Sequence, residues 1–278
     1  MKQIRLSLAA ASVLMTLVSV TAEAQWSYTS NSLSILASTT PRSKSQLCAK
    51  LKDISEFQKQ LKDSANRVSF RNTGGIANGG VCWWYSRFER NATYLAYFND
   101  RKPKPSQAQV MSIISALRRG DRLVEIPGFT NLSNFTFTYR AEIQASLEQW
   151  QVSDGVWGGG WLQGLQGRGA VSAQDMKRIL DETYDTVVRR KRVDFHLLPF
   201  GAIVNHAWLV VGMNRIANGY LIEVADSNFP GTVQVHRYQY GMTSLQYPYM
   251  GTTVPNNRSS YAAESERVLQ TLIANCKR

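Results

Sequence analysis

The sequence predicts an α+β protein in which a helical half precedes a β half. Up to about residue 190, apolar residues recur at spacings of three and four, as on the buried face of a helix. From residue 193 onward, β-branched and aromatic residues form short runs separated by Gly, Asn and Pro, as in the strands of an antiparallel sheet. We therefore expect a helical lobe over about 43–190, a β lobe over about 193–255 and a C-terminal helix over about 261–275.

The helical half divides into five expected helices, separated by breaks rich in glycine and proline. The helices are expected at 43–64, 81–98, 106–119, 140–151 and 172–190. Gly120 ends the third, and Ser172 opens the fifth with a pattern similar to a capping box. Phe135, Phe137 and Tyr139 alternate as in a strand, and glycine-rich loops are expected at 72–80 and 155–169.

The β half contains four expected strands. They are predicted at 193–198, 203–213, 220–224 and 232–238. Whether they form an open antiparallel sheet or a barrel is left open by the sequence.

The first 24 residues have the features of a secretory signal. Lys2 and Arg5 precede an apolar run, and Ala22-Glu23-Ala24 has the small-x-small pattern of a cleavage site. A transmembrane anchor is the alternative, but the apolar run is short for a membrane span. We expect a mature domain of residues 25–278 that is periplasmic or secreted, without a transmembrane anchor.

The formal net charge of the chain is +12, which suits contact with anionic cell-wall material. No recognised nucleic-acid motif appears, so a nucleic-acid partner is not expected. No C-x-x-C or H-x-x-x-H spacing is present, so no metal site is expected either. The sequence implies no cofactor.

The chain has three cysteines, and export would place them in an oxidising compartment. An odd number leaves one thiol unpaired. Cys48 falls in the first expected helix and Cys276 lies near the end of the last, and we expect these two to form a disulfide while Cys82 remains free. The other pairings stay open at this level.

Cys82 is the first candidate for chemistry. It follows Gly79-Gly80 at the expected start of a helix, where unpaired N–H groups and the helix dipole favour a thiolate. The glycines allow close approach of a substrate. The alternative for Cys82 alone is a buried structural cysteine among aromatic residues.

His206 and Asp226 complete a set of residue types that activates a thiol. His206 lies in an apolar strand and Asp226 ends the next one, and a thiol nucleophile needs a base and an orienting group of these kinds. Taken alone, His206 is typical of a core histidine and Asp226 of a turn residue. Of the other histidines, we expect His196 to be structural and His236 to lie on a surface strand.

Three stretches together resemble the papain-like cysteine proteases. Gly79-Gly80-Val81-Cys82-Trp83-Trp84 is similar to the nucleophile helix, Asn205–Gly212 to the histidine strand, and Gly219–Ser227 to the strand that follows. The separation of about 124 residues between Cys82 and His206 is near the lower edge of the range of the family. The resemblance implies a papain-like fold, with a helical cysteine lobe followed by a β histidine lobe.

The resemblance also implies roles for these residues. Cys82 would be the nucleophile, and His206 would remove or share the proton of its thiol and later protonate the leaving amine. Asp226 would orient the imidazole, with Asn228 as the fallback orienting residue. The sequence departs from the family where a glutamine normally stands six residues before the cysteine, because Ile76 occupies that position. We expect Asn78 and the Cys82 backbone N–H to serve as oxyanion donors instead.

Contacts to the substrate are expected from five residues around these motifs: Gly79, Gly80, Trp83, Trp157 and Trp161. The last two stand in a glycine-rich segment that could act as a mobile lip. A surface loop anchored by two tryptophans is the alternative.

The expected function is that of an exported papain-like cysteine peptidase acting on peptide or isopeptide bonds of a protein or peptide substrate. One alternative is a cell-wall amidase or endopeptidase, because Gly80–Tyr85 also resembles the motif of CHAP-type amidases. A second is an inactive papain-like binding protein, which Ile76 favours. A transacylase that uses the same three residues also stays open.

Overall fold

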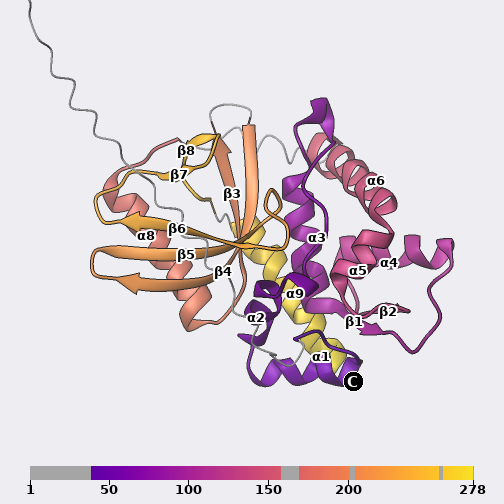
Figure 1. Ribbon diagram of the computed structural model, residues 1–278. Coiled ribbons are helices and arrows are strands. Elements are labelled where there is room, and N and C mark those ends of the chain that lie inside the picture. Colours follow the sequence, from indigo (N-terminus) through magenta and orange to yellow (C-terminus); the bar gives the residue numbers. More distant parts are fainter. Residues whose placement is uncertain (1–38, 158–168, 201–203, 257–258, 278) are drawn as a thin grey trace, which may run out of the picture. The chain divides into compact units, whose positions relative to one another are not determined.

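The computed structural model describes residues 39–157, 169–200, 204–256 and 259–277 (Figure 1). Helices come first, an antiparallel sheet follows, and a long helix ends the chain, which confirms the α+β class. The α-helices are α1 (Lys44–Ala49), α2 (Glu56–Lys62), α3 (Cys82–Leu95), α4 (Gln107–Arg119), α5 (Leu132–Thr138), α6 (Arg140–Trp150), α8 (Ala173–Tyr184) and α9 (Ser259–Cys276).

The expected helix over 43–64 is interrupted. Ser43 caps α1, a 3₁₀ turn η1 (Lys50–Lys52) follows, and α2 begins at Glu56. Between them Asp53 adopts an extended conformation and its carboxylate accepts the backbone N–H of Ser55 at 3.2 Å. This local side-chain bond competes with helix continuation, which explains the break.

Helix α3 is buried along nearly its whole length and ends earlier than expected. The chain leaves the helix at Ala96 and forms β1 (Ala96–Asn99), which pairs in parallel with β2 (Val124–Pro127). Helix α4 connects the two strands and ends at Gly120, as the sequence predicts. It begins with a capping box, and Gly120 adopts the left-handed conformation.

The predicted strand around Phe135, Phe137 and Tyr139 is wrong. These residues lie in and directly after α5, whose N-cap Asn131 accepts the backbone N–H of Asn134 at 2.8 Å. Phe135 is buried against Phe129 and Tyr139, whereas Phe137 is exposed. Three alternating aromatic residues also fit a short helix that buries only part of its surface.

All four predicted strands are confirmed and form one antiparallel sheet in the order β3-β4-β5-β6. They are β3 (Asp194–Phe200), β4 (Val204–Ile216), β5 (Gly219–Asp226) and β6 (Val233–Gln239). Among the described residues no pairing joins β3 to β6, so this sheet does not close into a barrel. A separate two-stranded sheet, formed by β7 (Leu245–Tyr247) and β8 (Gly251–Thr253), follows.

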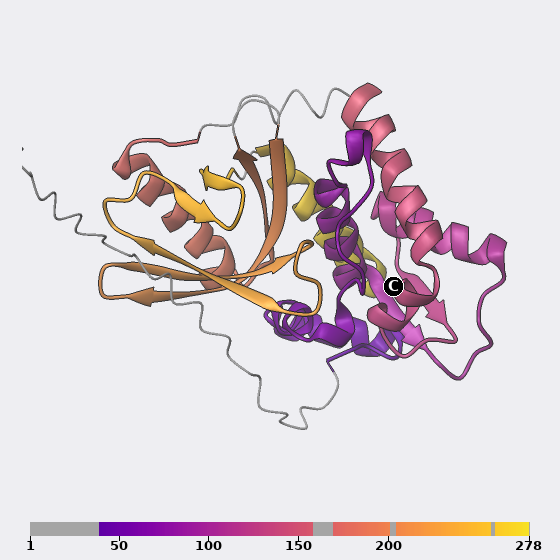
Figure 2. The ribbon, with the colours of Figure 1, turned by 45° about the horizontal axis from the view of Figure 1, so that its top comes forward.

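Strand β3 and the middle of β4 are buried on both faces, which explains their nearly continuous apolar residues. Leu209 and Val211 belong to the core shared with α3 and α9, whereas Trp208 and Val210 belong to the core shared with α8 and β7. Figures 1 and 2 show α3 and α9 on one side of the sheet and α8 on the other. The alternation along β4 therefore divides its apolar side chains between the two cores.

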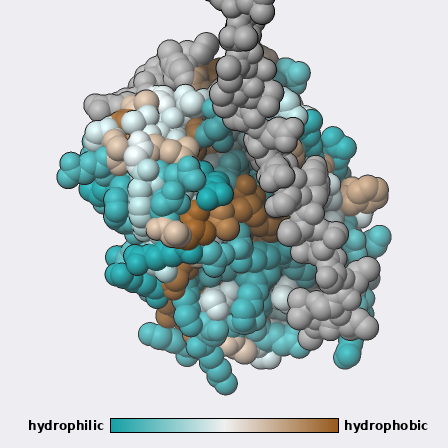
Figure 3. All heavy atoms as spheres, turned by 60° about the vertical axis from the view of Figure 1, so that its left-hand side comes forward, coloured by the Kyte–Doolittle hydropathy of each residue, from teal (hydrophilic) through white to brown (hydrophobic). Residues whose placement is uncertain are grey.

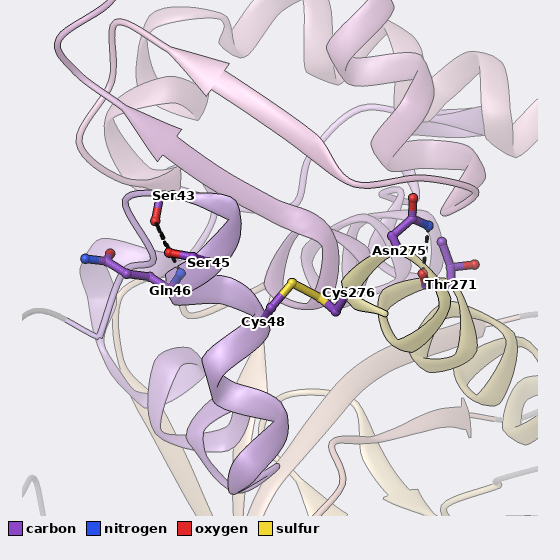
Figure 4. Close-up of a disulfide and its surroundings, with 7 residues drawn as sticks. All are labelled: Ser43, Ser45, Gln46, Cys48, Thr271, Asn275 and Cys276. Atoms are coloured by element: carbon purple, nitrogen blue, oxygen red, sulfur yellow. Dashed lines mark hydrogen bonds between the residues drawn. A yellow bond between two sulfur atoms is a disulfide. The ribbon is translucent and has the colours of Figure 1, made fainter. Parts of the chain in front are cut away.

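The predicted disulfide between Cys48 and Cys276 is confirmed. It joins α1 to the last residue of α9, with a Cα–Cα distance of 5.5 Å (Figure 4). Cys82 is free and buried. The bond fixes the two ends of the described chain to each other and leaves the thiol of Cys82 unpaired.

One face of the molecule is largely polar. On the face shown in Figure 3, hydrophilic residues surround a smaller apolar area. In the part of the chain that the structure describes, no helix has the length and apolar character needed to span a bilayer.

Candidate active site

Cys82 is the first residue of α3 and faces the sheet. Its Sγ lies 3.6 Å from the backbone carbonyl oxygen of Asn205 in β4, and the side chain is 7% exposed. One turn later Ser86 donates a hydrogen bond to the carbonyl of Ala207 at 3.2 Å. Because positions i and i+4 share a helix face, these contacts hold the start of α3 against β4 at the residues flanking His206.

The β4–β5 pairing brings His206 and Asp226 together. Trp208 is the direct partner of Asp226 in the antiparallel register, and His206, two residues earlier, lies on the same face as Trp208. His206 Nε2 is 2.8 Å from Asp226 Oδ1, and both side chains are buried. The structure therefore brings the predicted Cys82, His206 and Asp226 together, although they come from three elements.

Two further groups fix the Asp226 carboxylate. Oδ1 also accepts the backbone N–H of Asn228 at 2.8 Å, and Oδ2 accepts the hydroxyl of Tyr247 at 2.8 Å. Burial favours the neutral acid, but the charge of His206 and these hydrogen bonds outweigh it, so the pKa of Asp226 is lowered. Burial and Asp226 raise the pKa of Tyr247, which keeps its hydroxyl protonated as a donor.

The imidazole of His206 is held in its charged form. Burial lowers its pKa, but the Asp226 carboxylate and Cys82, through charge and hydrogen bonding, raise the pKa to about 10. Nε2 faces Asp226, so Nδ1 is the ring nitrogen that remains for the thiol. The ring also packs against Tyr247, with 5.1 Å between ring centroids.

Asn72 joins the start of α3 to the end of β5. Its Oδ1 accepts the backbone N–H of Val81 at 2.6 Å, and its backbone N–H donates to the carbonyl of Ser227 at 2.9 Å. Its side-chain amide also lies 3.4 Å from Asn228 Oδ1. Asp226 rather than the Asn228 side chain contacts the imidazole, since that side chain donates to Tyr247 at 3.1 Å.

The loop before Cys82 carries the predicted oxyanion donor Asn78. Asn78 is exposed, with a φ of 57°, and Ile76 beside it is 52% exposed. The described residues show no hydrogen bond from the Asn78 side chain to Cys82. Gly80 has a φ of +87°, and a Cβ there would lie 2.5 Å from Asn72 Nδ2, so the tight approach to α3 requires glycine.

The predicted substrate contacts fall in different environments. Gly79 is exposed and Gly80 is half-buried. Trp83 lies in the core, with its ring 5.5 Å from that of Tyr261, whereas Trp157 is 82% exposed at the end of the π-helix η4 (Gln151–Trp157). Trp161 lies outside the described residues.

The two remaining histidines, His196 and His236, are both buried. His196 is buried with Nε2 2.9 Å from Asp194 Oδ2, in agreement with a structural role. His236 was expected on a surface strand, and this is wrong. It is 6% exposed and packs 4.6 Å from the Trp208 ring, because the alternation of β6 turns it toward the core shared with α8. Within the described ranges, no three His, Cys, Asp or Glu side chains gather as a metal site requires.

Tyr247, Asn72 and Asn228 complete the site around the three predicted residues. Sequence reasoning did not find Tyr247 or Asn72, because neither stands in a recognisable motif. Comparisons with protein-family models, with curated proteins and with solved structures found no match. The assignment of the candidate site therefore rests on its geometry.

Proposed function

We propose that the protein is an exported cysteine peptidase of papain-like type that cleaves peptide or isopeptide bonds through a Cys82 acyl-enzyme. The observation that carries the proposal is a buried imidazole, His206, placed between a thiol at a helix N-terminus and a carboxylate with three hydrogen-bond partners. A merely structural histidine does not need a free thiol beside it.

The geometry supports an order of chemical steps. Cys82 Sγ attacks the carbonyl carbon of the scissile bond while His206 holds the proton. His206 then donates that proton to the leaving amine, and a thioester to Cys82 remains. A water molecule gives a proton to His206 as it attacks the thioester, which releases the acid and restores the thiol. Asp226 stays ionised throughout and stabilises the imidazolium.

The oxyanion of the tetrahedral intermediate needs donors beside Cys82. The backbone N–H of Cys82 is one, because the first N–H groups of a helix have no partner within the helix. The Asn78 amide is the proposed second donor, since its loop leads directly into α3. Loss of one such donor typically lowers the rate on the order of a hundredfold to a thousandfold.

A papain-like architecture is proposed on the same grounds. A buried helix presents its N-terminal cysteine to an antiparallel strand that carries the histidine, and the next strand ends in the acid. Export is proposed from the N-terminal signal features and agrees with the Cys48–Cys276 disulfide, because such bonds persist in oxidising compartments.

The test is hydrolysis by the mature protein and by Cys82→Ala and His206→Ala, with His196→Ala as a control at a second buried histidine. The substrates are a proteome-derived peptide mixture and purified cell walls, with new termini located by mass spectrometry. Peptide cleavage that both site variants abolish supports the proposal. Release of wall fragments alone would favour a wall amidase, and cleavage that survives Cys82→Ala would overturn any mechanism through this thiol.

A further inference from the structure

A hollow that is separate from the thiol site lies among α3, α4, α9 and the junction of α6 with η4. Its volume is about 320 Å³, and neither Cys82, His206 nor Asp226 lines it. Four arginines border it: Arg87, Arg118, Arg119 and Arg267. Arginine at this density suits recognition of an anion.

Two of the four guanidinium groups already have acidic partners. Arg87 forms ion pairs with Asp154 at 2.6 Å and Glu264 at 3.0 Å, and Arg119 pairs with Asp121 at 2.7 Å. Asp154 and Glu264 also line the hollow, but Arg87 neutralises the first, and Arg87 and Arg90 share the second. These carboxylates therefore leave the charges of the other two arginines uncompensated.

Arg118 and Arg267 have only neutral partners among the described residues. Arg118 Nη1 lies 3.4 Å from the carbonyl of Ser146 and from Gln149 Oε1, and Arg267 Nη1 donates to the carbonyl of Arg119 at 3.3 Å. Burial and the neighbouring Arg119 charge lower the pKa of Arg118, against a weaker opposite effect of Asp154. An anion in the hollow would stabilise the charged form of Arg118 and so oppose this lowering of its pKa.

The Trp150 ring lies beside two of the four guanidinium groups, those of Arg87 and Arg118. The Cζ of Arg87 lies 4.3 Å from the Trp150 ring centroid, and the Cζ of Arg118 lies 5.9 Å from it. Stacking on an indole restricts the guanidinium plane while its N–H edge stays available for hydrogen bonds. The arrangement lowers the entropy lost when an anion binds.

We propose that this hollow binds a phosphate group. Two uncompensated guanidinium charges match the charge of about −1.5 to −2 that a phosphate monoester carries at neutral pH, whereas a carboxylate would neutralise only one. The guanidinium fork also fits phosphate oxygens in pairs. The phosphate is either inorganic or the headgroup of an anionic lipid, and the proposal is independent of the chemistry at Cys82.

The experiment compares the mature protein with R118Q/R267Q and with the charge-matched R178Q/R189Q, whose residues do not line the hollow. Binding of inorganic phosphate is measured by isothermal titration calorimetry at constant ionic strength. Binding to vesicles is measured by flotation, with phosphatidic acid in phosphatidylcholine against phosphatidylcholine alone. We expect R118Q/R267Q to weaken binding at least about tenfold, because two charge-assisted hydrogen-bond groups are lost, and R178Q/R189Q to change it little.

The measurements with inorganic phosphate and with vesicles distinguish the two possible sources of the phosphate group. Binding of inorganic phosphate that depends on Arg118 and Arg267 supports a small-ion site, and binding confined to phosphatidic acid vesicles with the same dependence supports a headgroup site. Absence of both kinds of binding overturns the proposal. Binding that both double variants weaken equally also overturns it, because it would reflect net charge alone. Circular dichroism of the variants establishes that they are folded.

Discussion

His206 and His236 lie close together, yet their surroundings shift their pKa values in opposite directions. The pKa of His206 is raised to about 10, so the stability that its pairing contributes is complete below its ordinary pKa of 6.5 and is lost as the pH rises through about 10. The imidazolium is therefore the stable form at neutral pH. This is the form that a thiolate partner requires.

Burial lowers the pKa of His236 to about 4, against the opposing effects of Asp226 and of a hydrogen bond to the Gln246 backbone, while the charge of His206 lowers it further. The unfolded chain then binds more protons than the folded chain between pH 6.5 and 4, so stability falls as the pH falls across this range. The difference corresponds to roughly 3 kcal/mol. We expect His236→Gln to remove most of this loss, measured as the free energy of unfolding in urea between pH 7 and 4. An identical pH dependence in wild type and variant would contradict the assignment.

At the residue scale, the sequence predicted the three reactive groups and missed those that hold them. Cys82, His206 and Asp226 stand in stretches with recognisable local patterns. Tyr247 contacts Asp226 across 21 residues, and Asn72 contacts Asn228 across 156. No local spacing reports such pairs, because only the folded chain brings these distant residues together.

At the element scale, one face of α6 and its C-cap residue Gln151 support the loop that leads to Cys82. Gln144 donates to the carbonyl of Thr73 at 2.8 Å, Glu148 accepts the backbone N–H of Gly75 at 3.1 Å, and Gln151 accepts the N–H of Ile76 at 2.9 Å. Gln151 also donates to the carbonyl of Gly80 at 3.1 Å. Spacings of four and three place these side chains on one helix face.

We expect the loss of the Gln151 contacts to slow the reaction of Cys82 without a large loss of stability. Gln151→Ala should slow the reaction of Cys82 with a peptidyl chloromethyl ketone several-fold, because the loop no longer has a fixed path into α3. The free energy of unfolding should change by only about 1–3 kcal/mol, as for the loss of two typical hydrogen bonds. Gln149→Ala is the control, since Gln149 contacts Arg118 rather than the loop. Equal rates in the two variants would show that the loop does not depend on Gln151.

Strands were predicted correctly where their local sequence pattern was strong. The four strands of the sheet were predictable because β-branched and aromatic runs are separated by clear turn residues. Strand β1 was missed because Ala96–Asn99 continues the apolar character of α3 and becomes a strand only by pairing with Val124–Pro127. Its partner lies beyond a whole helix, so the information is tertiary.

At the scale of the whole molecule, a buried arginine joins the cysteine helix to the sheet. The Arg67 guanidinium is 3.5 Å from Glu89 of α3 and donates to the carbonyl of Asp226 at 3.1 Å and of Thr232 at 2.6 Å. Both charged side chains are 1% exposed. One residue therefore links α3 to β5 directly behind the reactive groups.

Removal of this arginine should destabilise the fold strongly. Arg67→Met leaves the Glu89 carboxylate buried without its partner, which typically costs about 3–5 kcal/mol. Arg42→Met, at an exposed pair with Asp100, should cost at most about 1 kcal/mol. Urea denaturation of both variants gives the comparison, and a similar small change in the two would contradict the role of Arg67.

The central claim is that Cys82 and His206 form a working thiolate–imidazolium pair, and the rate of Cys82 alkylation by iodoacetamide against pH tests it most directly. The label is located by mass spectrometry in the mature protein and in His206→Ala. We predict rapid labelling well below pH 7 that disappears in the variant. Labelling that rises only near pH 8.5, the range of an ordinary thiol, and that is the same in both proteins would contradict the claim.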